Sequence, residues 1–272
     1  MKNTIITLLL VVISSLSFGQ LTKEYTKITY LIPKDIVEKE YTISVKNIVS
    51  TKEYCKLAVT VTNKTDAILL FVPQEGSFNF EFGSRKSDTK DFYIMPHDSK
   101  TKTLTVNGGN EFLQEKFSAK LGLLIKIPTD KEVIETPNFI LPATKNSFST
   151  GDFNVVLKKY NASTKEAKAI FECTYTGNDI AVVNPSHLSV SAVRKGTDET
   201  VIYANDNKRS KPTPLKNGQK VKITAIFHIQ GRIVDMQFAT MEIIWNNTFI
   251  VTQPSPYLLP VINFELDKSL SN

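Results

Sequence analysis

Short runs of alternating apolar and polar residues make up most of the chain. Residues 41–45 (YTISV), 56–63 (KLAVTVTN) and 221–228 (VKITAIFH) are examples, and turn-forming pairs such as Asn107-Gly108 and Asn217-Gly218 separate the runs. In a β-strand a period of two places every second side chain on the same face. No stretch after residue 20 has apolar residues at the spacing of an amphipathic helix. The pattern predicts an all-β protein whose strands are buried on one face.

The alternation also predicts an internal repeat. When residues 41–73 are laid over residues 153–185, an offset of 112, the apolar positions keep their phase and Pro73 falls on Pro185. About seven or eight strands fall within each ~110 residues, which is typical of an immunoglobulin-like antiparallel sandwich. The expected fold is therefore two tandem immunoglobulin-like antiparallel β-sandwiches.

An aromatic–aliphatic–aliphatic–proline motif occurs three times, at Tyr30–Pro33, Phe139–Pro142 and Tyr257–Pro260. We interpret the motif as a domain border, because proline lacks the N–H that would continue strand pairing. The predicted domains are then residues 21–142 and residues 143–272.

The first residues predict export. Met1-Lys2-Asn3 precedes the apolar run TIITLLLVVISSLSF, and Ser17-Phe18-Gly19 supplies small residues before a cleavage point at Gln20. The run is shorter than the ~20 residues of a membrane span, although an N-terminal anchor helix is the alternative. We expect residues 1–19 to be a cleaved signal peptide, the mature chain to contain no membrane span, and the protein to be periplasmic or extracellular.

Composition narrows the classes of partner. The 272 residues carry a formal charge of +6, and nearly all of the excess is lysine. Arginine is the residue better suited to bidentate phosphate recognition, so nucleic acid is not an expected partner.

Two cysteines, Cys55 and Cys173, are too few for a disulfide framework and fall on different repeats. We expect each to be a buried thiol, and one bridge between the domains is the alternative.

The stretch Lys56–Asp66 (KLAVTVTNKTD) resembles bacterial exported immunoglobulin-like domains of unknown function. In those domains a v-x-v-x-N-x-T run leads from one core strand into the next. The second repeat departs from this pattern with ECTYTGND at residues 172–179. The resemblance implies the fold and transfers no catalytic or binding residue.

Residues suited to catalysis are few. The chain has three histidines, and His97-Asp98-Ser99 contains the letters of a catalytic triad, but proline and aspartate in this stretch equally fit a turn. We expect no catalytic residue, no cofactor and no metal. Calcium is the alternative, at Asp88 with Asp91 and at the pair Asp198-Glu199, where flanking arginines would pair with the acids instead.

The two candidate functions differ in whether the aromatic side chains must be buried or exposed. Phe78, Phe80 and Phe82 alternate as a core face does, and the single tryptophan, Trp245, ends a strand. We expect a non-enzymatic exported binding, adhesion or scaffold protein of the bacterial cell envelope. The alternative is a carbohydrate-binding or carbohydrate-processing accessory protein, which requires such rings to be exposed.

One loop is the candidate binding site. Three positions separate Tyr93 from Pro96, but eleven separate Tyr203 from Pro214, so the second repeat has eight extra residues within 204–213 (ANDNKRSKPT). Loops on rigid sandwiches are common recognition elements, although a long surface loop without a function is equally tolerated. The predicted contact residues for another envelope protein or an acidic surface component are Asn207, Lys208, Arg209 and Lys211.

Overall fold

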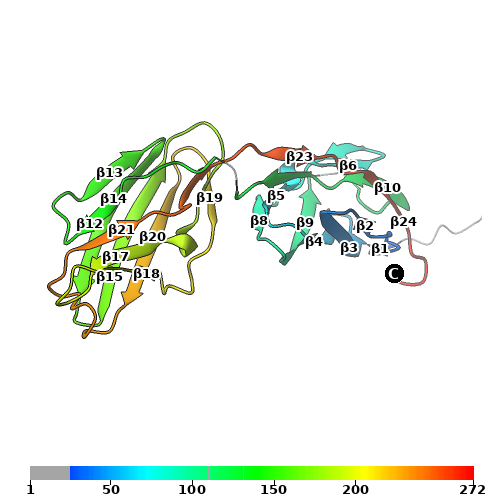
Figure 1. Cartoon of the computed structure of the whole chain (residues 1–272). Coiled ribbons are helices and arrows are strands. Elements are labelled where there is room, and N and C mark those ends of the chain that lie inside the picture. Colours follow the sequence, from blue (N-terminus) through cyan, green and yellow to red (C-terminus); the bar gives the residue numbers. More distant parts are fainter. Residues whose placement is uncertain (1–24, 109–110, 131) are drawn as a thin grey trace, which may run out of the picture.

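The computed structural model describes residues 25–108, 111–130 and 132–272. The expected signal peptide lies outside these residues. Figure 1 shows two bodies built of strands, lying end to end and joined by two extended segments. In the described residues no helix is long and apolar enough to cross a membrane. The structure confirms the predicted fold class, because the chain is all-β and forms two antiparallel β-sandwiches in tandem.

The first sandwich has two layers. One layer is a sheet with the order β1-β3-β4-β9, and β2 pairs with β3 at its edge. The other layer has four long strands that are each broken by a bend, giving the orders β24-β10-β6-β7 and β23-β11-β5-β8. The bounds are β1 (Ile28–Thr29), β2 (Ile36–Val37), β3 (Tyr41–Ser50), β4 (Tyr54–Asn63), β5 (Ile68–Val72), β6 (Ser77–Phe80), β7 (Gly83–Arg85), β8 (Phe92–Ile94), β9 (Ser99–Asn107), β10 (Lys116–Lys120), β11 (Leu123–Ile127), β23 (Ser255–Tyr257) and β24 (Val261–Glu265).

The second sandwich repeats this plan. Its layers have the orders β13-β14-β15-β20 on one side, and β12-β21-β17-β18 with β19-β16-β22 on the other. The bounds are β12 (Phe139–Leu141), β13 (Ser147–Thr150), β14 (Phe153–Ala162), β15 (Glu166–Tyr175), β16 (Ala181–Val183), β17 (Ser189–Val193), β18 (Thr200–Ala204), β19 (Thr213–Leu215), β20 (Lys220–His228), β21 (Met241–Ile244) and β22 (Phe249–Val251).

Glycine permits the bend in the second layer of the first sandwich. A Cβ atom on Gly76 would lie 2.4 Å from the carbonyl oxygen of Lys120, and one on Gly122 would lie 2.7 Å from that of Val72. Gly122 also has a φ of +155°, which other residues rarely adopt. The two broken strands therefore approach each other more closely at the bend than any side chain would allow.

Strand register supports the predicted offset of 112. Tyr41 lies opposite Asn63 in the first sandwich, and Phe153 lies opposite Tyr175 in the second. Pro73 and Pro185 each begin a one-turn 3-10 helix, η1 (Pro73–Glu75) and η2 (Pro185–His187). The inward positions are buried as the alternation predicts. The same local pattern thus produces the same strands in both halves.

The end of the chain corrects the predicted domain boundaries. β23 pairs with β11 and β24 pairs with β10, so residues 255–265 complete the first sandwich rather than the second. The equivalent edge of the second sandwich is formed by residues 133–141, through the bridge of Val133 to Ile250 and the pairing of β12 with β21. The assignment of residues 143–272 to the second sandwich is therefore wrong. That sandwich spans residues 132–252, and the first sandwich is discontinuous.

The proline motif has a different role from the one expected. Pro256 lies opposite Ile125, and Val133 bridges Ile250, an equivalent position of the second sandwich. With this register, each residue of the segment at 255–265 corresponds to the residue 123 positions earlier in the chain. Pro260 therefore aligns with Pro137 and not with Pro142. The motif segments at 139–142 and 257–260 belong to strands that seal the edges of the sandwiches. They do not mark borders.

The two sandwiches pack directly against each other. An apolar cluster joins Ile68, Leu70 and Ile127 of the first sandwich to Val182 and Ile250 of the second. Leu70 and Val182 occupy equivalent positions on β5 and β16, so corresponding faces of the two repeats meet. An ion pair of 3.3 Å between Lys216 of the second sandwich and Asp91 of the first also joins the two.

Both cysteines are free and buried, as expected, and they lie in different cores. Burial raises the pKa of the Cys55 thiol and of the Cys173 thiol to about 12. The thiols are therefore protonated at neutral pH and act as small apolar side chains.

Candidate binding site on the second sandwich

The loop at residues 205–212 is hydrogen-bonded to the exposed edge of a sheet. β20 is an edge strand, and the loop connecting β18 to β19 runs along it. The backbone N–H of Asp206 donates to the carbonyl of Ile226 at 2.8 Å, and the side-chain oxygen of Asn205 accepts from the N–H of Ile226 at 3.0 Å. The side-chain amide of Asn207 donates to the carbonyl of Thr224 at 3.0 Å. Asn207, one of the predicted contact residues, thus holds the loop on β20.

The first sandwich uses the same arrangement. The N–H of Asp88 donates to the carbonyl of Thr105 at 3.4 Å, and the Thr89 hydroxyl donates to the carbonyl of Thr103 at 3.0 Å. Asp88 and Thr89 therefore correspond to Asp206 and Asn207. Unpaired strand edges invite association with other chains, and both loops cover such an edge.

These contacts correct the predicted insertion. Tyr93 lies opposite Leu70, and at the equivalent position of the second sandwich Pro214 lies opposite Val182. Tyr93 thus corresponds to Pro214, not to Tyr203. Measured from the shared aspartates, the loop of the second sandwich is three residues longer, not eight. The other extra residues lie in the hairpin between β17 and β18. Similar residue types in the two repeats do not reveal this position, whereas the strand register does.

The predicted cations of this loop meet cations of the sheet. Lys208, Arg209 and Lys211 line a depression of about 570 Å³ together with Lys168 of β15 and Lys222 of β20. Asp206, Asn207 and His228 also line the depression, and the remaining side chains are apolar or carry hydroxyls: Pro185, Ser210, Thr213, Val221, Thr224 and Ile226. Within the described residues, none of these five cations has an acidic partner. The sequence did not single out Lys168 and Lys222, because each is simply an outward-facing lysine, on β15 and β20 respectively.

A histidine bridge lies at one end of the depression. Nδ1 of His228 lies 3.0 Å from a carboxylate oxygen of Asp206, and Nε2 lies 3.0 Å from one of Glu166. The hydrogen bond to Asp206, with a smaller contribution from Glu166, raises the pKa of His228. Among the described residues that line the depression, Asp206 is the only acid, and its carboxylate is already engaged by His228.

The corresponding surface of the first sandwich keeps one lysine, since Lys56 stands where the second sandwich has Lys168, but two other positions carry hydroxyls. Ser99 and Thr101 stand where the second sandwich has Lys220 and Lys222. Thr101 forms a hydrogen bond of 2.7 Å with Thr60, and Ser99 forms one of 2.8 Å with Thr62. The group of unpaired cations is therefore a feature of one sandwich and not of the fold that both share.

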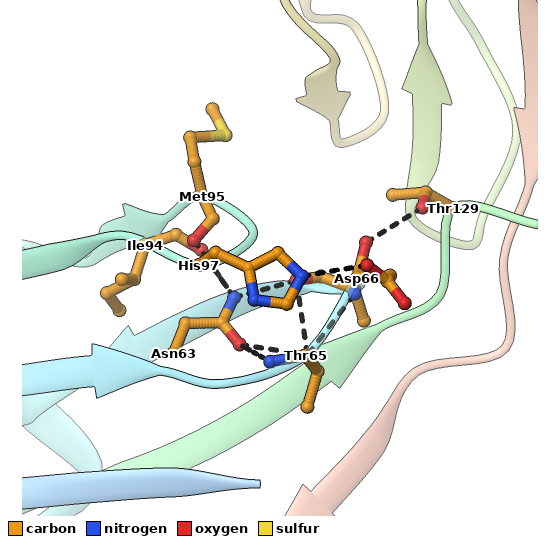
Figure 2. A network of polar contacts seen from close by, with 8 residues as sticks. Asn63, Thr65, Asp66, Ile94, Met95, His97 and Thr129 are labelled. Atoms are coloured by element: carbon orange, nitrogen blue, oxygen red, sulfur yellow. Dashed lines mark hydrogen bonds and ion pairs between the residues drawn. The ribbon is translucent and has the colours of Figure 1, made fainter.

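A second polar network explains the N-x-T pattern (Figure 2). Asn63, which is buried, donates from its side-chain amide to the carbonyls of Ala67, Ile94 and Met95, and its oxygen accepts from the N–H and hydroxyl of Thr65. These bonds fasten the turn after β4 to the turn before β9. The role of Asn63 and Thr65 is structural.

His97 belongs to the same network. It lies 2.8 Å from a carboxylate oxygen of Asp66, whose carbonyl accepts a hydrogen bond of 3.1 Å from the Thr129 hydroxyl. The hydrogen bond of His97 is thus made to Asp66 and not to the adjacent Asp98 or Ser99. The three letters that resemble a triad do not form one here.

The remaining sequence candidates have structural partners. Phe78 and Trp245 are 1% and 4% exposed, so neither offers a ring to a sugar. Glu199 pairs with Arg194 at 3.1 Å, as the sequence suggested, whereas Asp91 pairs with Lys216 of the second sandwich and not with the flanking Arg85. In the part of the chain that the structure describes, no three His, Cys, Asp or Glu side chains are grouped to hold a metal ion.

Comparison with known proteins gives only distant likeness. No protein-family model and no curated protein sequence matches the chain. A tandem CBM22 domain of Paenibacillus barcinonensis Xyn10C is 9% identical, with a TM-score of 0.24, and the match covers 90% of this chain and 99% of that one.

Two larger proteins are matched over a part. A red sea bream transglutaminase is 10% identical, with a TM-score of 0.20, over 82% of this chain and 32% of its own. The C-terminal globular domain of an oligosaccharyltransferase from Pyrococcus abyssi is 10% identical, with a TM-score of 0.20, over 88% and 49%. This chain thus spans less than half of either protein. At such TM-scores the fold assignment rests on the strand pairing of the chain itself.

Proposed function

We propose that the chain is a non-enzymatic, exported binding protein, an adhesion or scaffold module of the bacterial cell envelope, and that it binds an acidic partner through the depression on its second sandwich. One observation carries the proposal: five cations without acidic partners gather in one depression, from two strands and one loop. The resemblance of residues 56–66 to bacterial exported immunoglobulin-like domains supports the location.

The loop presents its charges from a fixed backbone. Three hydrogen bonds hold residues 205–207 on β20, so binding orders little additional chain. A single exposed ion pair contributes only ~0.2–1 kcal/mol, but several cations around one ligand act together. Salt screens such charges, so binding through them weakens measurably as the salt concentration rises.

Several features favour binding over catalysis. The thiols are buried and protonated, and His228 is held between two carboxylates rather than beside a nucleophile. The direct partner of His97 is Asp66, in an exposed turn. None of these arrangements supplies the nucleophile, base and orienting acid of a covalent mechanism.

The carbohydrate alternative loses its aromatic platform, since Phe78, Phe80 and Trp245 are buried and the partly buried Phe82 packs against the core. An acidic polysaccharide remains one form of acidic partner, because its carboxylates or sulfates would use the same cations. The proposal therefore names the charge of the partner, and the experiment below separates a protein from a glycan.

The experiment is retention of the partner from the organism's own envelope extract on the immobilised mature chain. A variant with Lys208→Ser, Arg209→Ser and Lys211→Ser is compared with a control that loses three exposed lysines elsewhere, Lys34→Ser, Lys52→Ser and Lys102→Ser. We expect several-fold weaker retention for the first variant only, with a larger difference at ~0.05 M than at ~0.5 M salt. Protease treatment of the extract abolishes retention of a protein and spares a glycan. Equal retention by both variants would refute the proposed site.

A further inference from the structure

The depression on the second sandwich continues across the outer face of its sheet. A smaller hollow of about 80 Å³ is lined by Lys159 and Asn161 of β14 and by Lys168 and Ile170 of β15. Lys168 lines both hollows, so the two lie side by side. We call the combined surface the cationic track. It runs from β14 over β15 and β20 to the loop at residues 205–212.

Strand register places the track across the strands rather than along them. Two rows of outward side chains cross the sheet, one made of Asn161, Lys168 and Ile226 and the other of Lys159, Ile170 and Thr224. The loop continues both rows, because the N–H of Asp206 and the side chain of Asn207 donate to the carbonyls of Ile226 and Thr224. Since neighbouring strands lie about 4.8 Å apart, the three steps from β14 to the loop span roughly 15 Å.

The charge of the track is positive along its whole length. It carries six cations that have no acidic partner within the described residues: Lys159, Lys168, Lys208, Arg209, Lys211 and Lys222. Three of them come from the loop and three from the strands. Lys159 therefore extends the group of unpaired cations to the strand furthest from the loop.

Acids on β15 lie on both sides of the track. Glu166 and Glu172 face outward at either side of Lys168 on the same strand. Glu172 is paired with two lysines, one of β14 and one of β20, at 3.2 and 3.6 Å, and Glu166 is paired with His228 at 3.0 Å. An anionic chain that followed the strand would meet a carboxylate in either direction. Only a path across the strands leads from one unpaired cation to the next.

The side chains of the track suit a sugar chain better than a protein surface. Protein interfaces are enriched in aromatic residues and depleted in lysine, whereas among the described residues that line the two hollows there is no Phe, Tyr or Trp. An extended peptide would need an unpaired strand edge, and the loop covers that of β20. The amide of Asn161 and the hydroxyl of Thr224 have no side-chain hydrogen-bond partner in the described part of the chain, so both can bind sugar hydroxyls. With no ring to stack on, the sugar chain must be held through its charges.

We propose that the cationic track binds a linear acidic polysaccharide, carrying carboxylate or sulfate groups, which lies across β14, β15 and β20 from Lys159 to the loop. This inference rests on the proposed function, since the loop supplies half of the cations, and it adds the class of the ligand, its direction and its length. Cations spread over roughly 15 Å engage successive anionic groups, so affinity grows until the sugar chain covers the track. A disaccharide is too short to reach from the loop to Lys159, whereas a hexasaccharide covers the distance.

The dependence of affinity on ligand length tests the proposal. Oligogalacturonates from disaccharide to octasaccharide, and sulfated heparin oligosaccharides of the same lengths, are titrated into the full mature chain at ~0.05 M salt, where screening is weak. We expect the affinity to rise at least tenfold from disaccharide to hexasaccharide and then to level off. Neutral oligosaccharides of equal length should not bind.

A charge reversal tests the far end of the track. Lys159→Glu should weaken binding of the octasaccharide several-fold and lower the slope of log Kd against log salt, because fewer counterions are displaced. The matched control is Lys46→Glu, since Lys46 lies opposite Ala58 in the first sandwich as Lys159 lies opposite Ile170 in the second. Both lysine side chains are exposed, and the unfolding free energy of each variant checks that folding is intact.

The outcomes separate this inference from the proposed function. If affinity does not rise with length, or if Lys159→Glu binds the octasaccharide as well as its control does, the track is overturned, while loss of binding in the triple loop variant would still support the acidic site. If polyglutamate peptides of equal charge bind as tightly as the oligosaccharides, the ligand class is wrong. If no acidic probe binds but the loop variant loses the envelope partner, this inference alone falls. If the loop variant also retains that partner as its control does, both are refuted.

Discussion

The Tyr257 hydroxyl of residues 253–272, the C-terminal arm, donates a hydrogen bond of 2.6 Å to the carboxylate of Glu40, 217 residues earlier in the chain. The other oxygen of Glu40 accepts from Lys126 of β11. The bonds from Lys126 and Tyr257 lower the pKa of Glu40, and burial together with the Glu40 carboxylate raises the pKa of Tyr257. Glu40 directly precedes β3, so this group joins the arm to both layers of the first sandwich.

Replacing Tyr257 with phenylalanine tests the strength of this connection. Tyr257→Phe removes one donor and leaves the ion pair of Glu40 with Lys126. Because the group is partly exposed, we expect the free energy of unfolding to fall by about 1 kcal/mol in a denaturant titration. Tyr54→Phe, at a partly exposed tyrosine without a hydrogen-bond partner in the described residues, is the control. Equal effects of the two substitutions would contradict the role of the Tyr257–Glu40 bond.

The His228 bridge predicts a pH dependence of stability. Since the pKa of His228 is raised in the folded chain, chiefly by Asp206, its contribution is complete below the unfolded pKa of ~6.5 and is lost as pH rises through the folded value. The groups are about half exposed, so we expect a loss of only ~0.5 kcal/mol between pH 6 and pH 8.5. The measurement is the unfolding free energy at several pH values, and His228→Gln should remove the slope in this window. An imidazole pKa at or below the ordinary value by NMR would argue against the bridge.

The second sandwich replaces the Asn63 network with a tyrosine and a glycine. Tyr175 stands where the first sandwich has Asn63, and Gly177 stands where it has Thr65. A Cβ on Gly177 would lie 2.3 Å from the Tyr175 hydroxyl and 2.5 Å from a carboxylate oxygen of Asp152. Tyr175 is 1% exposed, so its ring has little free space to move into. The two sandwiches thus close the same turn with different pairs of residues.

This pairing predicts a coupling between two substitutions. Gly177→Ala should lower the unfolding free energy by roughly 1–3 kcal/mol, the usual cost of forcing atoms into a packed site. In the background of Tyr175→Phe, which lacks the hydroxyl, the same substitution should cost less. A double-mutant cycle measures the difference. Strictly additive effects would show that the clash with the hydroxyl is not the cause.

The sequence was sufficient to predict those features of the fold that depend on residues close together in the chain. The phase of residues 41–63 and 153–175 was sufficient for the strands, their buried faces and the offset between the repeats, because side-chain alternation directly determines burial. The arm was missed because its partners on β10 lie about 145 residues away, and pairing over that distance leaves no periodic signal. The depression was half predicted: the loop cations stood out as a cluster, whereas Lys168 and Lys222 looked like any lysines on a solvent-facing strand.

Phe264 should be the main anchor of the arm, and the single tryptophan makes the test selective. Phe264→Ala removes a buried ring that stacks on Phe117, a change that typically costs ~3–5 kcal/mol, whereas Leu258→Ala, at a side chain 86% exposed, should change stability by less than ~0.5 kcal/mol. Trp245 lies in the core of the second sandwich, so its fluorescence follows that sandwich, while circular dichroism follows both. Because the arm completes only the first sandwich, Phe264→Ala should shift part of the circular-dichroism transition to lower denaturant and shift the Trp245 transition less.

If both signals shift together by the same amount, either the arm stabilises both sandwiches or the apolar interface around Leu70 and Val182 couples them into one unit. Repeating the measurement with Leu70→Ser added distinguishes these, because weakening the interface separates the transitions only in the second case.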